Sequence, residues 1–124
     1  MARRITSAEG KRLGLPGRSA LEMVSGDIGS QVTFRVVEIA VPQPGEAMRG
    51  PHLHRGYEEC IYVLKGEGRT FTESGAFDVK PGDVMLVPAH EKHVTRNTGA
   101  EPLILLCFFP TPDIVSTTDN FSNF

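Results

Sequence analysis

The chain has 124 residues, enough for one compact domain, and this length excludes a two-domain enzyme or a long repeat array within it. Its 13 Lys and Arg residues nearly balance its 15 Asp and Glu residues, and like charges do not cluster. This balance argues against a nucleic-acid or membrane-surface partner. A small-molecule substrate or ligand fits the composition better.

Cysteine content and hydropathy suggest where the protein works. The two cysteines, Cys60 and Cys107, lie far apart, and residues 1–6 contain no apolar stretch that could act as a signal sequence. No apolar run approaches the roughly 20 residues that a membrane-spanning helix needs. We therefore predict a cytoplasmic protein that is not integral to a membrane.

The N-terminal residues show little regular pattern. Thr6-Ser7-Ala8-Glu9 resembles a helix capping box, but Gly10 follows at once, so we expect at most one helical turn. We interpret residues 1–20 as a flexible arm.

Short β-branched runs separated by Gly and Pro turns follow the arm and predict an all-β domain over residues 21–110. The segment 32–41 is apolar on both faces, which predicts that a second sheet or barrel closure covers it twice. No helix longer than a turn or two is expected. The expected strands are residues 21–24, 32–41, 59–64, 69–72, 76–79, 84–87, 93–96 and 103–109.

The C-terminal tail, residues 111–124, is polar apart from a few apolar residues that include two phenylalanines. Two interpretations stay open for it: a flexible arm, or a segment that packs on a neighbouring subunit.

All four histidines occur in two pairs, His52/His54 and His90/His93, inside one 42-residue window. On an extended strand, a spacing of two places the imidazoles of His52 and His54 on the same face, about 6 to 7 Å apart. That separation lets both bind one metal ion, although a pair of solvated surface histidines would look the same in sequence.

Glu59 favours the metal site over the surface pair. It lies five residues after His54, and a turn or bulge at residues 55–57 would let the next strand begin with Glu59, Ile61 and Val63 facing inward. A carboxylate in an apolar inward row needs a cation nearby, since Asp and Glu are rarely buried unless paired. The preceding Glu58 would then face solvent.

His93 supplies a fourth candidate ligand. After a turn at residues 89–92, His93, Thr95 and Asn97 alternate along a strand, so His93 can face the same interior. Three imidazoles and one carboxylate suit one divalent transition metal, and Fe, Mn, Co, Ni, Cu and Zn all remain open.

The ligand pattern resembles the first motif of the cupin superfamily. That motif has a glycine, a His-x-His pair, a glutamate and a second glycine, matched here by Gly45, His52, His54, Glu59 and Gly66. The seven-residue step from Glu59 to Gly66 selects Glu59 over Glu58.

The second cupin motif is matched by Gly82, Pro88, His93 and Asn97, and the whole resemblance covers residues 32–110. Two features depart from the family pattern. Six residues instead of five separate Gly45 from His52, and His90 stands where the family usually has a glycine. His90 could be an extra ligand, an acid/base group or a surface turn residue.

The resemblance implies a double-stranded β-helix, the jelly-roll barrel of cupins, with one divalent metal held by His52, His54, Glu59 and His93. It also implies a homodimer, for which the apolar strand 103–109 and both tails could supply a swapped edge.

Activity is less narrowly implied, because fold does not select among cupin reactions. Our first hypothesis is an enzyme that chelates a small oxygen-rich substrate, such as a hydroxy or keto acid, an enediol or a sugar derivative. Its reaction would be a dioxygenase, lyase or isomerase step, with Glu59, Tyr57 and His90 as candidate proton-transfer groups. The alternatives are a non-catalytic metabolite-binding or sensing module and a purely structural metal. Arg35, Arg49 and Arg69 are candidates to pair with a substrate carboxylate or phosphate.

Overall fold

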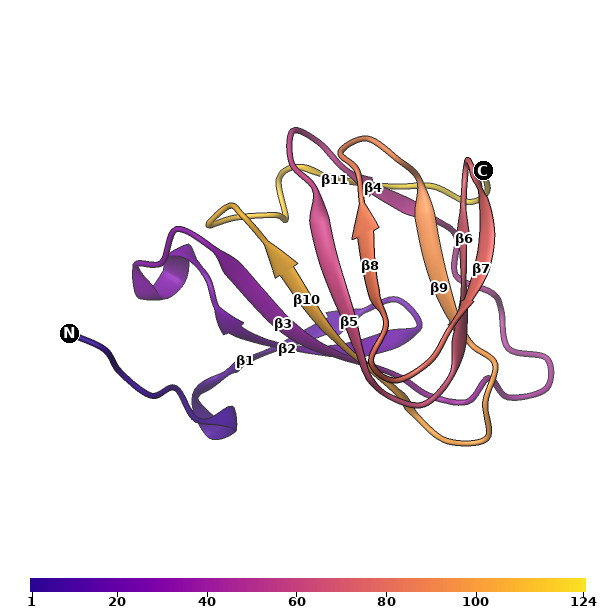
Figure 1. The fold of residues 1–124 in the computed structure, drawn as a ribbon, viewed down its shortest axis with the longest axis horizontal. Coiled ribbons are helices and arrows are strands. Elements are labelled where there is room, and N and C mark those ends of the chain that lie inside the picture. Colours follow the sequence, from indigo (N-terminus) through magenta and orange to yellow (C-terminus); the bar gives the residue numbers. More distant parts are fainter.

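The computed structural model describes residues 1–124 and contains eleven strands and two short 3₁₀ turns (Figure 1). The elements in chain order are η1 (Ser7–Glu9), β1 (Lys11–Leu15), β2 (Arg18–Val24), η2 (Gly26–Ile28), β3 (Thr33–Ile39), β4 (His52–His54), β5 (Glu59–Lys65), β6 (Gly68–Thr72), β7 (Gly75–Val79), β8 (Val84–Val87), β9 (His93–Asn97), β10 (Leu103–Phe109) and β11 (Thr118–Asn120).

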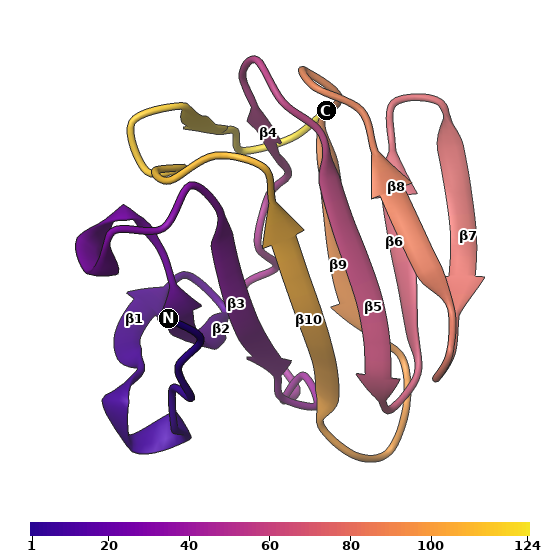
Figure 2. The same cartoon turned by 60° about the vertical axis from the view of Figure 1, so that its left-hand side comes forward.

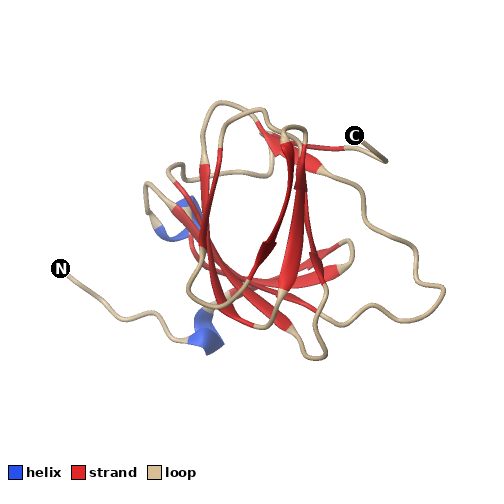
Figure 3. Ribbon diagram, turned by 45° about the vertical axis from the view of Figure 1, so that its right-hand side comes forward, coloured by secondary structure: helices blue, strands red, loops and turns tan.

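The strands form two sheets in which every paired strand is antiparallel (Figure 3). One sheet has the order β1-β2-β3-β10-β5-β8, and the other has the order β11-β4-β9-β6-β7. The chain crosses between the sheets several times, as in a jelly roll, and the predicted all-β fold is confirmed.

The N-terminal residues are more ordered than their sequence suggested. The single helical turn is present as η1, where the Glu9 carboxylate accepts hydrogen bonds from the backbone and hydroxyl of Thr6. The prediction of a flexible arm over residues 1–20 is nevertheless wrong, because β1 and the start of β2 form a hairpin at the sheet edge. Leu13 and Leu15 alternate along β1 and pack against the core, which fixes the hairpin on the sheet.

The C-terminal tail also packs on its own domain. Strand β11 pairs with β4, and Ile114 is only 3% exposed within the core. The expectation of a flexible tail is therefore wrong for residues 114–120, whereas the alternative that the tail packs on a neighbouring subunit stays a prediction. The tail covers the end of the molecule at which β4 lies, as Figure 1 shows.

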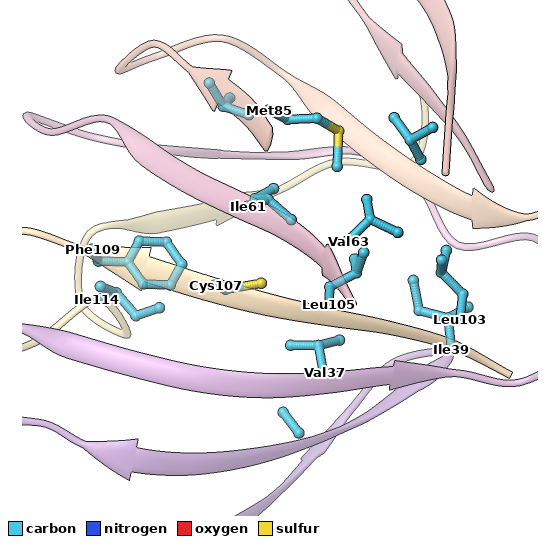
Figure 4. Close-up of a cluster of buried hydrophobic side chains, with 13 residues drawn as sticks. Val37, Ile39, Ile61, Val63, Met85, Leu103, Leu105, Cys107, Phe109 and Ile114 are labelled. Atoms are coloured by element: carbon cyan, nitrogen blue, oxygen red, sulfur yellow. The ribbon is translucent and has the colours of Figure 1, made fainter. Parts of the chain in front are cut away.

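The hydrophobic core lies between the two sheets. Figure 4 shows Val37, Leu105 and Val63 side by side on neighbouring strands of the larger sheet. The 13 core residues are Ala20, Val37, Ile39, Ile61, Val63, Val79, Met85, Val87, Leu103, Leu105, Cys107, Phe109 and Ile114.

Gly66 and Asn97, two residues of the sequence motifs, fix the loops at the opposite end of the core from β4. Gly66 has φ +86°, and a Cβ there would lie 2.6 Å from the Pro102 carbonyl oxygen, so no larger residue fits without a shift. Buried Asn97 donates to the carbonyls of Ile39 and Glu101 and accepts from the backbone of Gly99. These contacts join the β5–β6 turn, the β9–β10 turn and β3.

The outer face of the six-stranded sheet is less covered than predicted. Along β3 the inner residues are buried, but Phe34 and Val36 on the outer face are only half-buried. The predicted second cover over this face is therefore absent from the chain itself. Figure 2 shows β10 in the middle of the sheet, between β3 and β5, so β10 cannot supply the swapped edge that its sequence suggested.

No helix in the structure combines the length and the apolar character that crossing a membrane requires.

Candidate functional site

Four polar side chains converge between the sheets. His52 and His54 lie on β4 and His93 lies on the neighbouring β9, all in the five-stranded sheet, where His52 is directly opposite His93. Glu59 reaches them from the first position of β5 in the other sheet. A bend at residues 55–57, with Gly56 at φ +89°, reverses the face as predicted and turns Glu59 inward.

The four side chains form a tight group. One candidate ligand atom from each lies within 4.8 Å of the others. Oε1 of Glu59 is 3.3 Å from Nε2 of His54 and 3.2 Å from Nε2 of His93. Glu59, His54 and His93 are buried, whereas His52 is partly exposed. The structure thus brings together the four metal ligands that the sequence predicts.

Hydrogen bonds orient the histidines of the group. Nδ1 of His54 is 2.9 Å from the Thr118 hydroxyl, which donates its own proton to the carbonyl of Ile114. The Thr118 oxygen must then accept from Nδ1–H of His54, which leaves the lone pair of Nε2 facing Glu59. Nδ1 of His93 lies 3.0 Å from the carbonyl of Glu91 and is fixed in the same way. Such outer partners set the tautomer of a metal-binding histidine.

The charge states suit cation binding. Burial, followed by repulsion from His93, lowers the pKa of His52 to about 2, so His52 is neutral at pH 7. Burial alone would raise the pKa of Glu59, but the imidazoles of His54 and His93 hold it below its usual range. The site at neutral pH therefore combines an ionised carboxylate with the neutral imidazole of His52.

A metal fits this group of residues. Nε2 of His54 is buried and has no hydrogen-bond partner, although it points into the group. A buried polar atom without a partner is costly, and a metal ion would satisfy it. Three imidazoles with one carboxylate are a donor set for a divalent transition metal, and a metal held by these four residues would have room for water or substrate as further ligands.

The group opens onto a cavity of about 220 Å³ between the sheets. The volume lies below the range of about 300 to 1,000 Å³ typical of pockets for drug-sized ligands, so the occupant must be small. Glu59 is the only carboxylate that lines the cavity. The other polar lining residues are Arg18, Arg35, Arg49, His52, His54, His93, Thr95, Cys107, Thr118 and Asn120.

Two predicted catalytic residues do not line the cavity. Tyr57 stacks on His54, with ring centroids 5.8 Å apart, and its hydroxyl is 2.7 Å from the hydroxyl of Thr117. Burial raises the pKa of Tyr57, which keeps the phenol protonated. Tyr57 therefore supports a ligand and does not face the cavity.

His90 is exposed, and its Nε2 accepts a hydrogen bond from the backbone of Gly56. It has φ +68°, a left-handed conformation that glycine adopts most easily. The geometry gives His90 a role in holding two loops together and does not bring it to the metal ligands. Glu58 is exposed, as expected.

Sequence analysis missed two residues of the site, Arg18 and Thr118. Arg18 lies in the segment that we interpret as an arm, although Leu13 and Leu15 alternate before a Pro16-Gly17 turn, a pattern that predicts a hairpin. Thr118 lies in the tail, where three residues of strand give no recognisable pattern.

The three arginines proposed to face the substrate have different positions. Arg49 lines the cavity without a carboxylate partner. Arg35 lines it but is paired with Glu22 at 2.8 Å. Arg69 is paired with Asp78 outside the cavity.

Comparisons with known proteins support the interpretation of the fold. A family model described as "Cupin domain" matches residues 39–109. An uncharacterized protein of Methanocaldococcus jannaschii is 31% identical over 86 residues, which cover 69% of this chain and 67% of that protein. An oxalate-binding protein of Thermotoga maritima is 36% identical over 63 residues, 51% of each chain.

Similar enzymes are larger than this chain. Glucose-6-phosphate isomerase of Thermococcus gammatolerans is 34% identical over 64 residues, 48% of this chain and 34% of the enzyme. The solved structure of Lactobacillus farciminis oxalate decarboxylase has a TM-score of 0.74 and 25% identity, and the match covers 92% of this chain and 34% of that one. The chain thus spans about a third of the length of each of these two enzymes.

Proposed function

The chain belongs to the cupin family, and from this premise we propose that it is a metal-dependent enzyme acting on a small oxygen-rich substrate. The observation that carries the proposal is the buried His₃Glu group, whose candidate ligand atoms lie within 4.8 Å of one another at the wall of a cavity. A structural zinc site would be closed and cysteine-rich, whereas this one opens onto space for a substrate.

His52, His54, Glu59 and His93 would hold one divalent transition metal. When bound, the metal supplies a Lewis acid that polarises a chelating oxygen of the substrate. The substrate class is a hydroxy or keto acid, an enediol or a sugar derivative. The similarity to an isomerase and a decarboxylase favours isomerase or lyase chemistry over a dioxygenase reaction.

Glu59 is our candidate proton acceptor because it is the only carboxylate at the cavity. Its pKa is held below the usual range by His54 and His93 against the effect of burial, so it is a weak base. The group that gives up the proton must therefore be strongly acidified itself, as is a carbon next to a polarised carbonyl.

Elemental analysis tests the metal site. We expect the protein, purified without chelators or a His-tag column, to contain close to one equivalent of a transition metal, and the His52→Ala variant to contain none. The loaded protein should then convert a hydroxy acid, keto acid or sugar phosphate in assays run with and without O₂. Absence of metal from both proteins would contradict the enzyme proposal.

The second candidate function is a non-catalytic binding module, which the similarity to an oxalate-binding protein favours. In that case the loaded protein should bind a small acid in titration calorimetry and return it unchanged. Product formation that tracks metal content would exclude this candidate.

We also propose a homodimer formed through the outer face of the six-stranded sheet. Apart from Glu38 at the end of β3, the outward residues of β3, β10, β5 and β8 are apolar and make continuous rows across the sheet. Those that are exposed by 38% to 62% are Tyr62, Leu64, Val84, Leu86 and Phe108. These five large side chains neighbour one another across β8, β5 and β10, and a contiguous exposed apolar patch of this kind is typical of a protein interface. A second copy offers the same apolar surface.

The Val84→Lys/Leu86→Lys double variant should be monomeric in sedimentation velocity at micromolar concentration, where we expect the wild type to be a dimer. Both side chains are 62% exposed, so the charges should cost the monomer little stability. Phe77→Lys is the matched control, because Phe77 is 44% exposed on β7 of the other sheet. A monomeric wild type would contradict the proposed interface.

A cytoplasmic location is likewise our proposal. The thiols of Cys60 and Cys107 are free, and they lie on opposite faces of neighbouring strands, where they cannot form a disulfide with each other.

A further inference from the structure

Two arginines from separate segments meet at one wall of the cavity. Arg18 follows the Pro16-Gly17 turn of the β1–β2 hairpin, and Arg49 precedes β4. A Cβ on Gly17 would lie 3.5 Å from Cβ of Arg49, so the turn and the Arg49 side chain are in contact. The β1–β2 hairpin, which we had expected to be a flexible arm, therefore places the guanidinium of Arg18 at the cavity.

Neither of these guanidiniums has a carboxylate partner. Arg18 donates only to the carbonyl of Pro16, at 3.0 Å, and Arg49 only to that of Thr95, at 2.9 Å. In contrast, Arg35, Arg55 and Arg69 each pair with an acid at 2.8 to 3.1 Å. A guanidinium has five N–H donors, so most donors of Arg18 and Arg49 remain free.

The electrostatics of this wall favour an anion. Burial lowers the pKa of Arg18, and burial followed by repulsion from Arg18 and Arg96 lowers the pKa of Arg49 to about 10. Glu59, the only carboxylate at the cavity, points at His54 and His93 and forms no ion pair with Arg18 or Arg49. A divalent metal on the four ligands would add further positive charge, so a neutral occupant would leave the cavity strongly cationic.

We propose that Arg18 and Arg49 form an oxyanion clamp that binds a carboxylate or phosphate of the substrate while the rest of the molecule reaches the His₃Glu group. The inference rests on the proposed function and narrows its substrate class to small acids. Planar, forked guanidiniums match both oxyanions in geometry. The cavity volume of about 220 Å³ limits the ligand to a few non-hydrogen atoms beyond the anionic group.

Titration calorimetry on metal-free protein tests the clamp without relying on turnover. The probes are malonate, inorganic phosphate and the neutral malonamide. We expect malonate, phosphate or both to bind, malonamide not to bind, and affinity to fall with added salt. Comparing malonate with phosphate tells which oxyanion the clamp prefers.

Arg18→Gln and Arg49→Gln should each weaken binding of the anion at least tenfold, and Arg18→Lys and Arg49→Lys should recover part of it. Arg69→Gln is the matched control, since Arg69 is paired with Asp78 outside the cavity, and it should bind like the wild type. Thermal melts followed by circular dichroism verify that each variant is folded.

The proposed clamp and the proposed metal site can be tested independently of each other. His52→Ala should lose the metal but keep anion binding, and Arg18→Gln should keep a full metal equivalent. If neither anion binds the wild type, if malonamide binds equally well, or if the Gln variants bind like the wild type, the clamp is wrong whatever the metal content.

Discussion

His93→Ala is expected to abolish metal binding while leaving a folded domain. His93 is 2% exposed, and its Nε2 points at Glu59 from 3.2 Å, so its loss removes one of four ligands from the centre of the group. Of its two contacts with imidazoles, Glu59 would then keep only the one with His54. Metal content by elemental analysis should fall from about one equivalent to background.

The fold should survive this change because His93 contributes little to the core itself. Val94 beside it is fully buried, and strand β9 is held by pairing with β6 along its length. Leaving buried polar groups without partners costs about 1 to 3 kcal/mol, which is small enough for the domain to remain folded. Circular dichroism checks the fold, and His93→Gln is a second variant that keeps a polar side chain.

His90→Ala is the matched control for His93→Ala. His90 is exposed and lies only three residues earlier, so a general effect of losing an imidazole in this loop would appear in both variants. The control should keep its full metal content. A full equivalent of metal in His93→Ala would overturn the assigned site.

The sequence allowed most of the candidate metal site to be predicted because its candidate ligands are set by local spacing. His52 and His54 share a face through simple alternation, and Gly56 makes the bend that turns Glu59 inward. His93 alternates with two other buried residues on β9. Local rules of this kind need no knowledge of which strands pair.

Residues that depend on distant pairing could not be predicted in the same way. Thr118 reaches His54 only because β11 pairs with β4 in a register that sets these two residues opposite each other. His90 looked like a ligand because it is a histidine near His93, yet its left-handed backbone belongs to a turn whose exposed side chain lies outside the cavity. The contacts of such residues can be assigned only once the pairing of the strands is known.

The two ends of the chain were misjudged for a related reason. Each supplies one short strand to a sheet edge, β1 and β11, and a strand of three to five residues carries few apolar positions: two leucines before a turn in β1 and none in β11. Both short strands nevertheless contribute to the site, because the N-terminal hairpin places Arg18 at the cavity and the tail places Thr118 there.

Thr118→Val is expected to weaken metal binding by about 10- to 100-fold without removing any ligand. The hydroxyl of Thr118 donates to the Ile114 carbonyl and so accepts from Nδ1–H of His54, at 2.9 Å. Valine keeps the shape but cannot accept, so the tautomer that presents Nε2 of His54 to the metal is no longer favoured. Competition with a chelator of known affinity gives the change in metal affinity.

Thr117→Val separates this effect from a general loosening of the tail. Thr117 is the adjacent residue, and its hydroxyl contacts Tyr57 at 2.7 Å, so its removal also costs the tail one side-chain hydrogen bond. If tail packing alone mattered, both variants would lose affinity together, and the assigned role of Thr118 would be wrong. If the tautomer of His54 matters, Thr118→Val alone loses affinity and Thr118→Ser, which keeps the hydroxyl, restores it.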